Sequence, residues 1–173
     1  MEAQTFTKLD VGCGRHRLPD AVGIDQFPGP LIDHVHDVNQ APWPVGSERF
    51  SYIRCQHAIE HFRDVHTVAR EMYRSAQPGA MIEFITPHYS SYASWGDPTH
   101  LHHFALASIP LLFEQAVGEG NFEVVKNDLK FSGSGLDLFG WLLYKLSRKK
   151  YEKHFAWIFP ANEIHTTIRI NKK

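Results

Sequence analysis

The chain has 173 residues, 43% of them hydrophobic, which is enough apolar material for one core and predicts a single domain over residues 1–173. A formal net charge of -1 argues against nucleic acid as a partner, and no apolar run approaches the roughly 20 residues that span a bilayer. The N-terminus lacks the apolar core of a secretion signal and the two cysteines suit reduced thiols, so we expect a cytoplasmic protein without a transmembrane segment.

The first half of the chain alternates short apolar runs with turn residues. We expect strands over residues 8–11, 21–24, 32–36, 50–55 and 80–86. A helix is expected over residues 64–76, where apolar residues recur at helical spacing until Pro78 and Gly79 stop it. This alternation is typical of an α/β sheet. Because few residues separate the first two strands, the first crossover should be short, with a helix of one turn or none.

The last third of the chain is richer in large apolar residues. Residues 122–125 and 166–170 are expected to be strands, and they enclose a stretch rich in Leu, Trp and Phe over residues 135–159. Its spacing predicts a helix that belongs to the core or forms a lid. A homodimer through residues 135–159 and docking on a membrane surface are the alternatives.

Two glycines and two acids lie within or next to the first two expected strands. Asp10 lies in the first strand, Gly12 and Gly14 come directly after it, and Asp25 ends the second strand. Ligands of open α/β sheets bind at these strand ends, where glycine lets the backbone approach closely. Turn capping is the structural alternative for the acids. A dinucleotide would need a third glycine and a helix N-terminus, which residues 15–20 do not offer.

Five ordered segments carry a family resemblance. They are Leu9–Gly14, Gly23–Asp25, Asp37–Asn39, Phe50–His61 and Met72–Gly79. They resemble the successive motifs of class I S-adenosylmethionine-dependent methyltransferases, and most of all the small bacterial type-11 members, in which a Pro-Trp-Pro segment, here residues 42–44, follows the third strand. The resemblance implies a Rossmann-like, mostly parallel sheet with an antiparallel last strand, here without N-terminal cap helices. It covers residues 8–105 as the cofactor-binding core and leaves residues 106–173 for C-terminal helices and the last strands.

The resemblance also implies S-adenosylmethionine as the cofactor and a small molecule as the methyl acceptor. The cofactor-binding residues that it implies are Asp10, Gly12, Gly14, Asp25, Asp37, Val38 and Gln56. Asp10 and the glycine loop would hold the methionyl group. Asp25 would bind the ribose hydroxyls, and Asp37 with Val38 would meet the adenine. A catalytically inactive subunit that binds the donor is the alternative function.

Histidines are concentrated after the fourth and fifth expected strands. A hydroxyl acceptor loses a proton when it attacks the methyl group, and histidine has the pKa to take that proton near neutral pH. The candidate catalytic bases are His57, His61, His88 and His100. The alternative for each of them is a structural role with backbone hydrogen bonds. Residues 88–104 and the stretch 135–159 are expected to roof the acceptor pocket together, because excluding water favours the displacement.

The segment from His57 to His61 also has metal-ligand spacing. His57, Glu60 and His61 stand at positions i, i+3 and i+4, on one face if the segment is helical. In the small-RNA 3′-terminal methyltransferases and the ubiquinone-pathway O-methyltransferases, a Glu-x-x-Glu-His segment at this place holds a divalent ion. Here the first position carries His or Gln, so we expect no metal, with a metal-dependent O-methyltransferase as the alternative. The Asn/Asp-Pro-Pro-Tyr motif of DNA amino-methyltransferases is replaced by residues 56–59, which again argues against nucleic acid.

Overall fold

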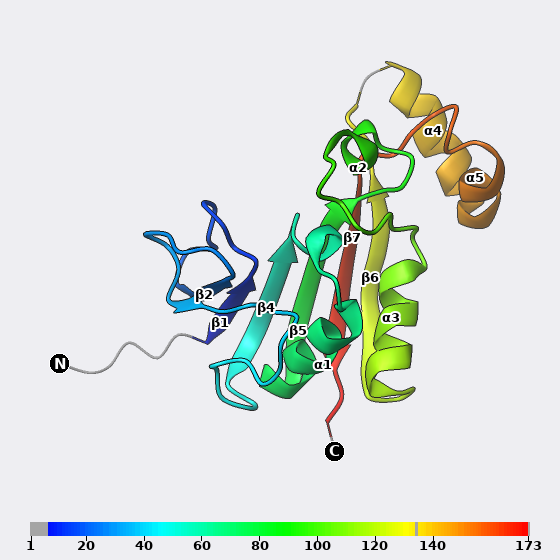
Figure 1. The fold of residues 1–173 in the computed structure, drawn as a ribbon. Coiled ribbons are helices and arrows are strands. Elements are labelled where there is room, and N and C mark those ends of the chain that lie inside the picture. The colour runs from blue at the N-terminus through cyan, green and yellow to red at the C-terminus, as the bar shows by residue number, and fades with distance from the viewer. Residues whose placement is uncertain (1–6, 134, 173) are drawn as a thin grey trace.

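The computed structural model describes residues 7–133 and 135–172, which form an α/β structure around a seven-stranded sheet (Figure 1). The strands are β1 (Lys8–Val11), β2 (Ala21–Asp25), β3 (His34–Val35), β4 (Phe50–Gln56), β5 (Ala76–Pro87), β6 (Phe122–Lys130) and β7 (Glu163–Ile170). Their order across the sheet is β3-β2-β1-β4-β5-β7-β6. Neighbouring strands from β3 to β5 are parallel, and β7 is antiparallel to both β5 and β6. The expected mostly parallel sheet with an antiparallel last strand is confirmed, whereas the expectation about N-terminal cap helices falls on residues 1–6, outside the described residues.

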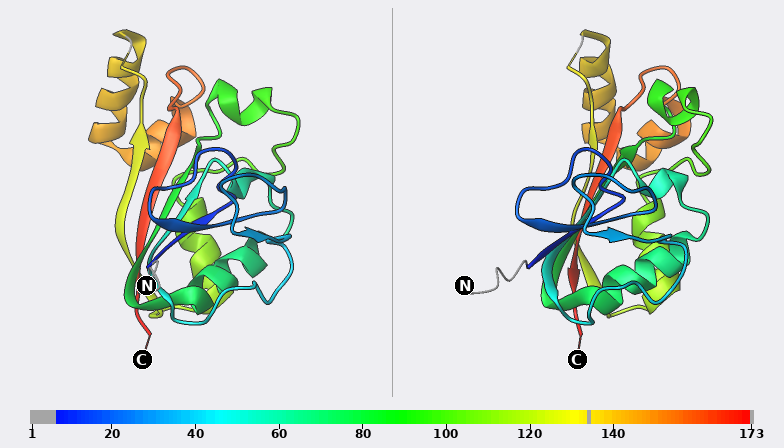
Figure 2. Two further views of the ribbon diagram at one scale, coloured as in Figure 1. Left: turned by 90° about the vertical axis from the view of Figure 1, so that its left-hand side faces the viewer. Right: turned by 60° about the vertical axis from the view of Figure 1, so that its left-hand side comes forward.

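Two helices pack together on one face of the sheet (Figure 2). The described helices are η1 (Ile59–His61), α1 (Val65–Ser75), α2 (Tyr92–Gly96), α3 (Ser108–Val117), α4 (Gly135–Leu146) and α5 (Arg148–His154). In α1 the apolar side of the helix, with Val68 and Met72, joins the same buried core as Ile82 of β5. Asp64 caps this helix, because its carboxylate accepts the Thr67 N–H at 2.9 Å. Helices α1 and α3 therefore cover the face of the sheet that holds the core.

The first crossover has no helix in the described chain. Residues 12–20 form a loop instead, closed by the Gly12 N–H, which donates to the Ile24 carbonyl at 2.9 Å. Strand β3 is shorter than expected. The Asp33 carboxylate accepts the Gly23 N–H at 2.8 Å and so takes the place of a backbone carbonyl in a longer ladder. The short crossover predicted from the sequence is thus confirmed, and side-chain hydrogen bonds replace regular structure around it.

Two elements differ from what the sequence pattern predicts. Strand β5 starts directly where α1 ends, at Ala76, four residues before the expected strand. Helix α3 was not predicted, and it contains a proline. Pro110 lies in the first turn of α3, where the N–H that it lacks has no intrahelical partner in any case.

The C-terminal helical unit, which comprises α4 and α5, lies beyond the upper ends of β6 and β7 in Figure 1. Gly140 allows α4 to pack closely, because a Cβ there would lie 3.0 Å from the Cβ of Phe159 and 3.1 Å from the ring of Phe131. The buried Tyr151 of α5 donates its hydroxyl to the Phe159 carbonyl at 2.6 Å. None of the helices in the described ranges combines the length and apolarity needed to cross a membrane.

Candidate active site

The loop after β1 presents two glycines with left-handed backbone conformations. Gly12 has φ of 65° and Gly14 has φ of 48°, which L side chains rarely adopt. A Cβ at Gly12 would lie 2.5 Å from the Cβ of Ala58 and 3.0 Å from the ring of Phe62, whereas a Cβ at Gly14 would meet nothing within 4 Å. Gly12 is therefore needed for the loop to approach the segment after β4, and Gly14 leaves open space beside the loop.

Asp25 ends β2 and directs its carboxylate at this loop. Its Oδ2 accepts the Gly14 N–H at 3.0 Å, and its Oδ1 accepts the Phe27 N–H at 3.0 Å. Each carboxylate oxygen has a second acceptor site. The side chain is partly exposed and can accept two hydroxyl groups of a ligand while it holds the loop.

Asp10 is engaged by protein groups. It is only 1% exposed, and Arg54 donates to both of its oxygens, from Nε at 3.1 Å and from Nη2 at 2.7 Å. The Leu18 N–H donates to Oδ2 at 2.7 Å. Asp10 and Arg54 are register partners on β1 and β4. The carboxylate therefore fixes the course of the loop, and the expected contact with a methionyl ammonium competes with Arg54.

Asp37 turns its carboxylate back onto its own segment. It accepts the Asn39 N–H at 3.1 Å and the Asn39 side-chain amide at 2.7 Å, and Arg63 lies 3.5 Å away. The hydrogen bond from the Asn39 side chain lowers the pKa of Asp37. These contacts are those of a turn cap, the structural alternative for this acid. Its neighbour Val38 is buried and reaches the cavity described next.

Two adjoining cavities lie at the carboxyl ends of β1, β2 and β4, and we call them together the inner cavity. The larger, of about 400 Å³, is lined by Gly12, Asp25, Gln26, Phe27, Val38, His57, Ala58, His61, Phe62 and Thr99. The smaller, of about 230 Å³, is lined by Asp10, Gly12, Cys13, Gly14, Arg15, His16, Arg54, Gln56 and His57. The fold thus brings six of the seven predicted cofactor residues to one place, and Asp37 does not line either part.

A further cavity of about 770 Å³, which we call the outer cavity, lies against the inner one. Its lining residues are His57, Glu60, His61, Pro87, Ser91, Tyr92, Ala93, Gly96, Asp97, Pro98, His100, Asn162 and Glu163. His57 and His61 line both the inner and the outer cavity. A ligand in one cavity can therefore meet a ligand in the other at these two histidines.

The ring of His57 stands between two carboxylates. Its Nδ1 lies 3.7 Å from Oε1 of Glu60, and its Nε2 lies 3.1 Å from Oε1 of Glu163. Glu60 is the main cause that raises the pKa of His57. The backbone at His57 has a φ of 48°, an uncommon conformation for a side chain of this size. The two carboxylates favour the protonated, positively charged form of this ring.

His61 and His100 are held in the opposite way, each with one nitrogen left as an acceptor. The Thr99 hydroxyl donates to Asp97 at 2.6 Å, so its oxygen accepts from Nδ1 of His61 at 2.9 Å. Nδ1 of His100 lies 3.0 Å from the Ser94 carbonyl, to which it can only donate. In the neutral form of each ring the proton is therefore on Nδ1 and the lone pair on Nε2, which in His100 lies 4.0 Å from Oδ2 of Asp97.

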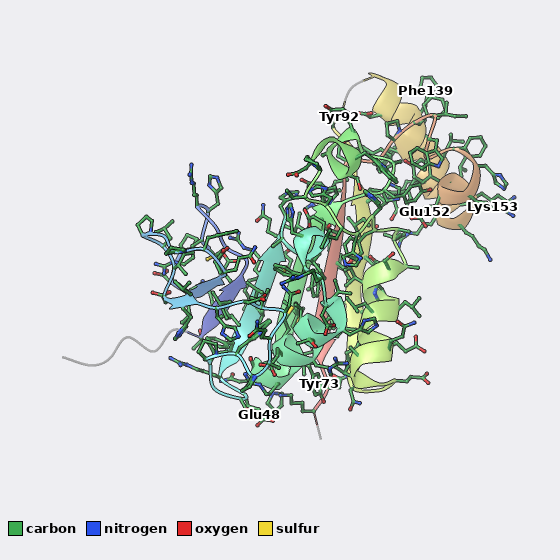
Figure 3. All side chains as sticks on the ribbon, viewed as in Figure 1. Glu48, Tyr73, Tyr92, Phe139, Glu152 and Lys153 are labelled. Carbon is green, nitrogen blue, oxygen red and sulfur yellow. The ribbon has the colours of Figure 1, made fainter. Side chains whose placement is uncertain are left out.

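His88 does not reach either cavity. Its ring is fully buried, with Nδ1 2.7 Å from Oγ of Ser90 and Nε2 3.1 Å from Oε1 of Glu152. Glu152 comes from α5 (Figure 3) and also accepts the Leu106 N–H at 2.7 Å. His88 thus ties the end of β5 to the C-terminal helical unit and lines neither the inner nor the outer cavity.

Three residues of the outer cavity also converge as potential metal ligands. Glu60, His61 and His100 each offer one ligand atom, and these atoms lie within 4.8 Å of one another. Glu60 is buried, and its Oε2 accepts from the Thr86 hydroxyl at 3.0 Å. One carboxylate and two imidazoles are ligand types that zinc and iron sites use. The sequence indicated His57, Glu60 and His61, with His88 or His100 to complete a site, and the fold brings Glu60, His61 and His100 together.

The outer cavity is roofed differently from what we expected. Residues 91–98 do line it, through Tyr92 among others, but no described residue of the stretch 135–159 does. The chain returns to this cavity only at Asn162 and Glu163. The stretch after α5 instead contacts the other side of the segment that lines the cavity, where the ring centroid of Trp157 lies 6.3 Å from that of Trp95 in α2.

Sequence analysis missed several residues of the site. Phe27 and Phe62 line the inner cavity, and Glu163 reaches His57 from β7. An aromatic residue two positions after the acid of β2 is a signal that could have indicated Phe27. Glu163 is far from His57 in the sequence, and no local pattern pairs the two.

Comparison with known proteins agrees with this geometry. The model of a family described as a methyltransferase domain matches residues 7–127. An S-adenosylmethionine-dependent methyltransferase from Archaeoglobus fulgidus superposes with a TM-score of 0.67 at 16% identity, covering 96% of this chain and 88% of that one. One from Mesorhizobium loti gives 0.60 at 13% identity, covering 94% and 89%. Phosphoethanolamine N-methyltransferase 2 of Haemonchus contortus, in complex with S-adenosyl-L-methionine, gives 0.59 at 10% identity, covering 96% and 48%. No curated protein matches the chain.

Proposed function

The chain belongs to the methyltransferase-domain family, and from this premise we propose that it transfers the methyl group of its cofactor, S-adenosylmethionine, to a small molecule in the outer cavity, with His61 as the general base. The observation that carries this proposal is that the inner and outer cavities share lining residues. His57 and His61 border both of them, so a methyl group delivered from the inner cavity meets an acceptor there.

The residues that line the inner cavity suit S-adenosylmethionine chemically. Gly12 keeps the loop free of a side chain, and Asp25 has acceptor sites for both ribose hydroxyls. Val38, Phe27 and Phe62 offer apolar surface to the adenine. When bound, the cofactor supplies an electrophilic methyl group on a positively charged sulfur, and the sulfur keeps the electron pair of the broken bond as a neutral thioether.

His61 is better suited than His57 to accept the acceptor's proton. When a hydroxyl acceptor is methylated, Nε2 of His61 would take its proton. The hydrogen bonds from His61 to Thr99 and from Thr99 to Asp97 hold the proton on Nδ1 and keep Nε2 ready to accept one. The two carboxylates beside His57 favour its charged form, in which neither ring nitrogen has a lone pair.

The base is tested after a screen of sugars, phenols and amines has identified an acceptor. We expect His61→Asn to lower turnover by about 10²- to 10⁴-fold, with a much smaller change in the affinity for the donor. His66→Asn, on the surface of α1, is the matched control and should keep the wild-type rate. A wild-type rate in His61→Asn would rule out this base and leave His57 and His100.

The donor site is tested separately, by calorimetric titration with S-adenosylmethionine and with its thioether product. Asp25→Asn removes charge-assisted hydrogen bonds worth about 1.5 to 3 kcal/mol, so the donor should bind about 10- to 100-fold more weakly. Glu119→Gln makes the same change of charge at an exposed position away from both cavities and should bind normally. Equal affinities in the two variants would contradict the role of Asp25.

The convergence of Glu60, His61 and His100 favours a second candidate function, metal-dependent O-methyl transfer. A divalent ion there would lower the pKa of a bound hydroxyl, and His61 would then be a ligand instead of a base. We expect turnover to survive chelation. Stoichiometric metal in the purified protein, together with loss of turnover on chelation and recovery with one added metal, would replace the first candidate by the second.

A further inference from the structure

Helix α4 turns most of its apolar side chains toward solvent. Its exposed residues, which we call the α4 stripe, are Leu138, Phe139, Trp141, Leu142 and Leu146. Leu138, Leu142 and Leu146 follow one another at four-residue spacing and so form one line along the helix, and Leu146 is 82% exposed. Phe139 stands on the outer side of α4, away from the sheet (Figure 3). A contiguous apolar surface of this kind marks a place of interaction.

The other side of α4 is already packed, so the helix cannot turn its stripe inward. Gly140 lies against Phe159 and Phe131, with no room for a Cβ. Tyr144 is 1% exposed, and its hydroxyl donates to Asp128 of β6 at 3.0 Å. The stripe is therefore a fixed outer surface of the C-terminal helical unit.

A cluster of positive charge flanks the stripe. Between residues 145 and 154 the chain has five basic residues and one acid, although its formal net charge is -1. The basic residues, which we call the basic cluster, are Lys145, Arg148, Lys149, Lys150 and Lys153. Lys149, Lys150 and Lys153 form no ion pair with any residue that the structure describes. The single acid, Glu152, faces inward to His88, while Lys153 extends outward from α5 (Figure 3).

The aromatic residues of this region add a second indication. Trp141 in the stripe and Trp157 after α5 are both exposed, and Nζ of Lys145 lies 5.9 Å from the ring of Trp141. Tryptophan is enriched at interfaces between an apolar phase and water, as at the headgroup level of a bilayer. Leucine, tryptophan and lysine on one helix face are typical of helices that lie on anionic membranes.

Charge decides between the two occupants that fit an apolar helix face. In a symmetric dimer the same patch meets its own copy, so the basic cluster of one chain would lie near that of the other. A bilayer that contains anionic phospholipids instead complements the basic cluster, because each Lys or Arg near its surface is attracted to the negative headgroups. We propose that the α4 stripe and the basic cluster dock the protein on the surface of an anionic phospholipid membrane.

This docking has a consequence for the acceptor. Helix α2 lies at the same end of the molecule as α4 (Figure 1), and Tyr92 at its start is exposed and lines the outer cavity. A docked protein would therefore hold the outer cavity close to the lipid headgroups, which favours a membrane-associated acceptor. This consequence depends on the proposed function, whereas the docking itself does not.

Docking is tested by flotation of the full chain with vesicles. We expect binding to vesicles of phosphatidylcholine mixed with phosphatidylglycerol, at least about tenfold weaker binding to phosphatidylcholine alone, and loss of binding at high salt. Leu142→Ser should weaken binding about tenfold, because the leucine no longer enters the bilayer. Lys149→Glu should weaken it by a similar factor on anionic vesicles only.

Matched variants separate docking from general damage. Leu111→Ser on α3 changes a leucine that is 51% exposed, against 45% for Leu142, and Arg70→Glu on α1 makes the same change of charge as Lys149→Glu. Both controls should bind vesicles like the wild type, and all four variants should bind S-adenosylmethionine normally. Absence of vesicle binding, equal binding to neutral and anionic vesicles, or equal losses in the controls would overturn the proposal. A dimer in solution that Leu142→Ser dissociates would assign the stripe to a second copy instead.

Discussion

The loops around the inner cavity and the C-terminal helical unit are held by opposite kinds of interaction. Around the cavity, Asp10 binds Arg54 and Asp25 binds the Gly14 N–H, so charged hydrogen bonds replace the missing first helix. In the C-terminal unit, rings pack on rings, as where Tyr151 meets Phe131 with centroids 5.7 Å apart. Hydrogen bonds are directional and hold a loop in one shape. Ring packing stabilises a unit through its buried side, so it places no requirement on the side chains of the exposed side.

The largest effect is expected where a buried charge loses its partner. Arg54→Met leaves the Asp10 carboxylate buried and uncompensated, which should lower the free energy of unfolding by about 3 to 5 kcal/mol. Denaturant unfolding followed by circular dichroism measures this. The double variant Asp10→Asn with Arg54→Met should recover part of the loss. If Arg54→Met unfolds like the wild type, the polar network does not hold the loops.

The next largest effect distinguishes the two glycines. Gly12→Ala combines a strained φ with a Cβ only 2.5 Å from Ala58, which should cost about 2 to 4 kcal/mol of stability and abolish donor binding. Gly14→Ala has a similar φ and nothing within 4 Å, so about 1 to 2 kcal/mol is expected. Thermal unfolding and donor titration compare the two. Equal losses would mean that strain alone, and not the close approach to Ala58, makes Gly12 necessary.

A smaller effect is expected within the aromatic region. Tyr151→Phe keeps the ring and removes the hydroxyl that donates to the Phe159 carbonyl, leaving that acceptor without its partner. A loss of about 1 to 2 kcal/mol should follow, with donor affinity unchanged. The measurement is the same denaturant titration. Weaker donor binding in this variant would show that the C-terminal helical unit and the donor site are coupled.

The smallest effect concerns the pH dependence of stability through His57. Because Glu60 raises the pKa of His57 above its usual 6.5, the folded protein binds the proton more tightly than the unfolded chain does. This contribution is fully present below pH 6.5 and is lost as the pH rises through the folded-state pKa. The side chain is partly exposed, so about 1 kcal/mol or less is expected. Unfolding at a series of pH values, with His57→Asn as the comparison, measures it, and identical pH profiles would contradict the raised pKa.

The sequence predicted the parallel core of the fold well, since its signals are local. Strand β1 has the predicted bounds, and α1 ends one residue from where Pro78 and Gly79 indicated a stop. Helix α3 was missed. Proline usually argues against a helix, but Pro110 lies in the first turn of α3, where a proline is tolerated. Strand β3 was overestimated, since the alternation of Ile32 and Val35 with polar residues does not reveal that the Asp33 side chain accepts the Gly23 N–H.

For the site, the sequence by itself determined the motif residues, because a glycine loop and a strand-end acid carry their function within a few positions. Gly12, Gly14, Asp25 and Val38 all reach the inner cavity as their motifs indicated. Only the tertiary structure decided which histidines face a cavity and which are buried, because their partners are distant in sequence: Glu163 beside His57, and Glu152 on His88. It also decided that α4 faces solvent. Helical periodicity identifies an apolar face but not what covers it, and that depends on the space left by the strands and helices already packed together.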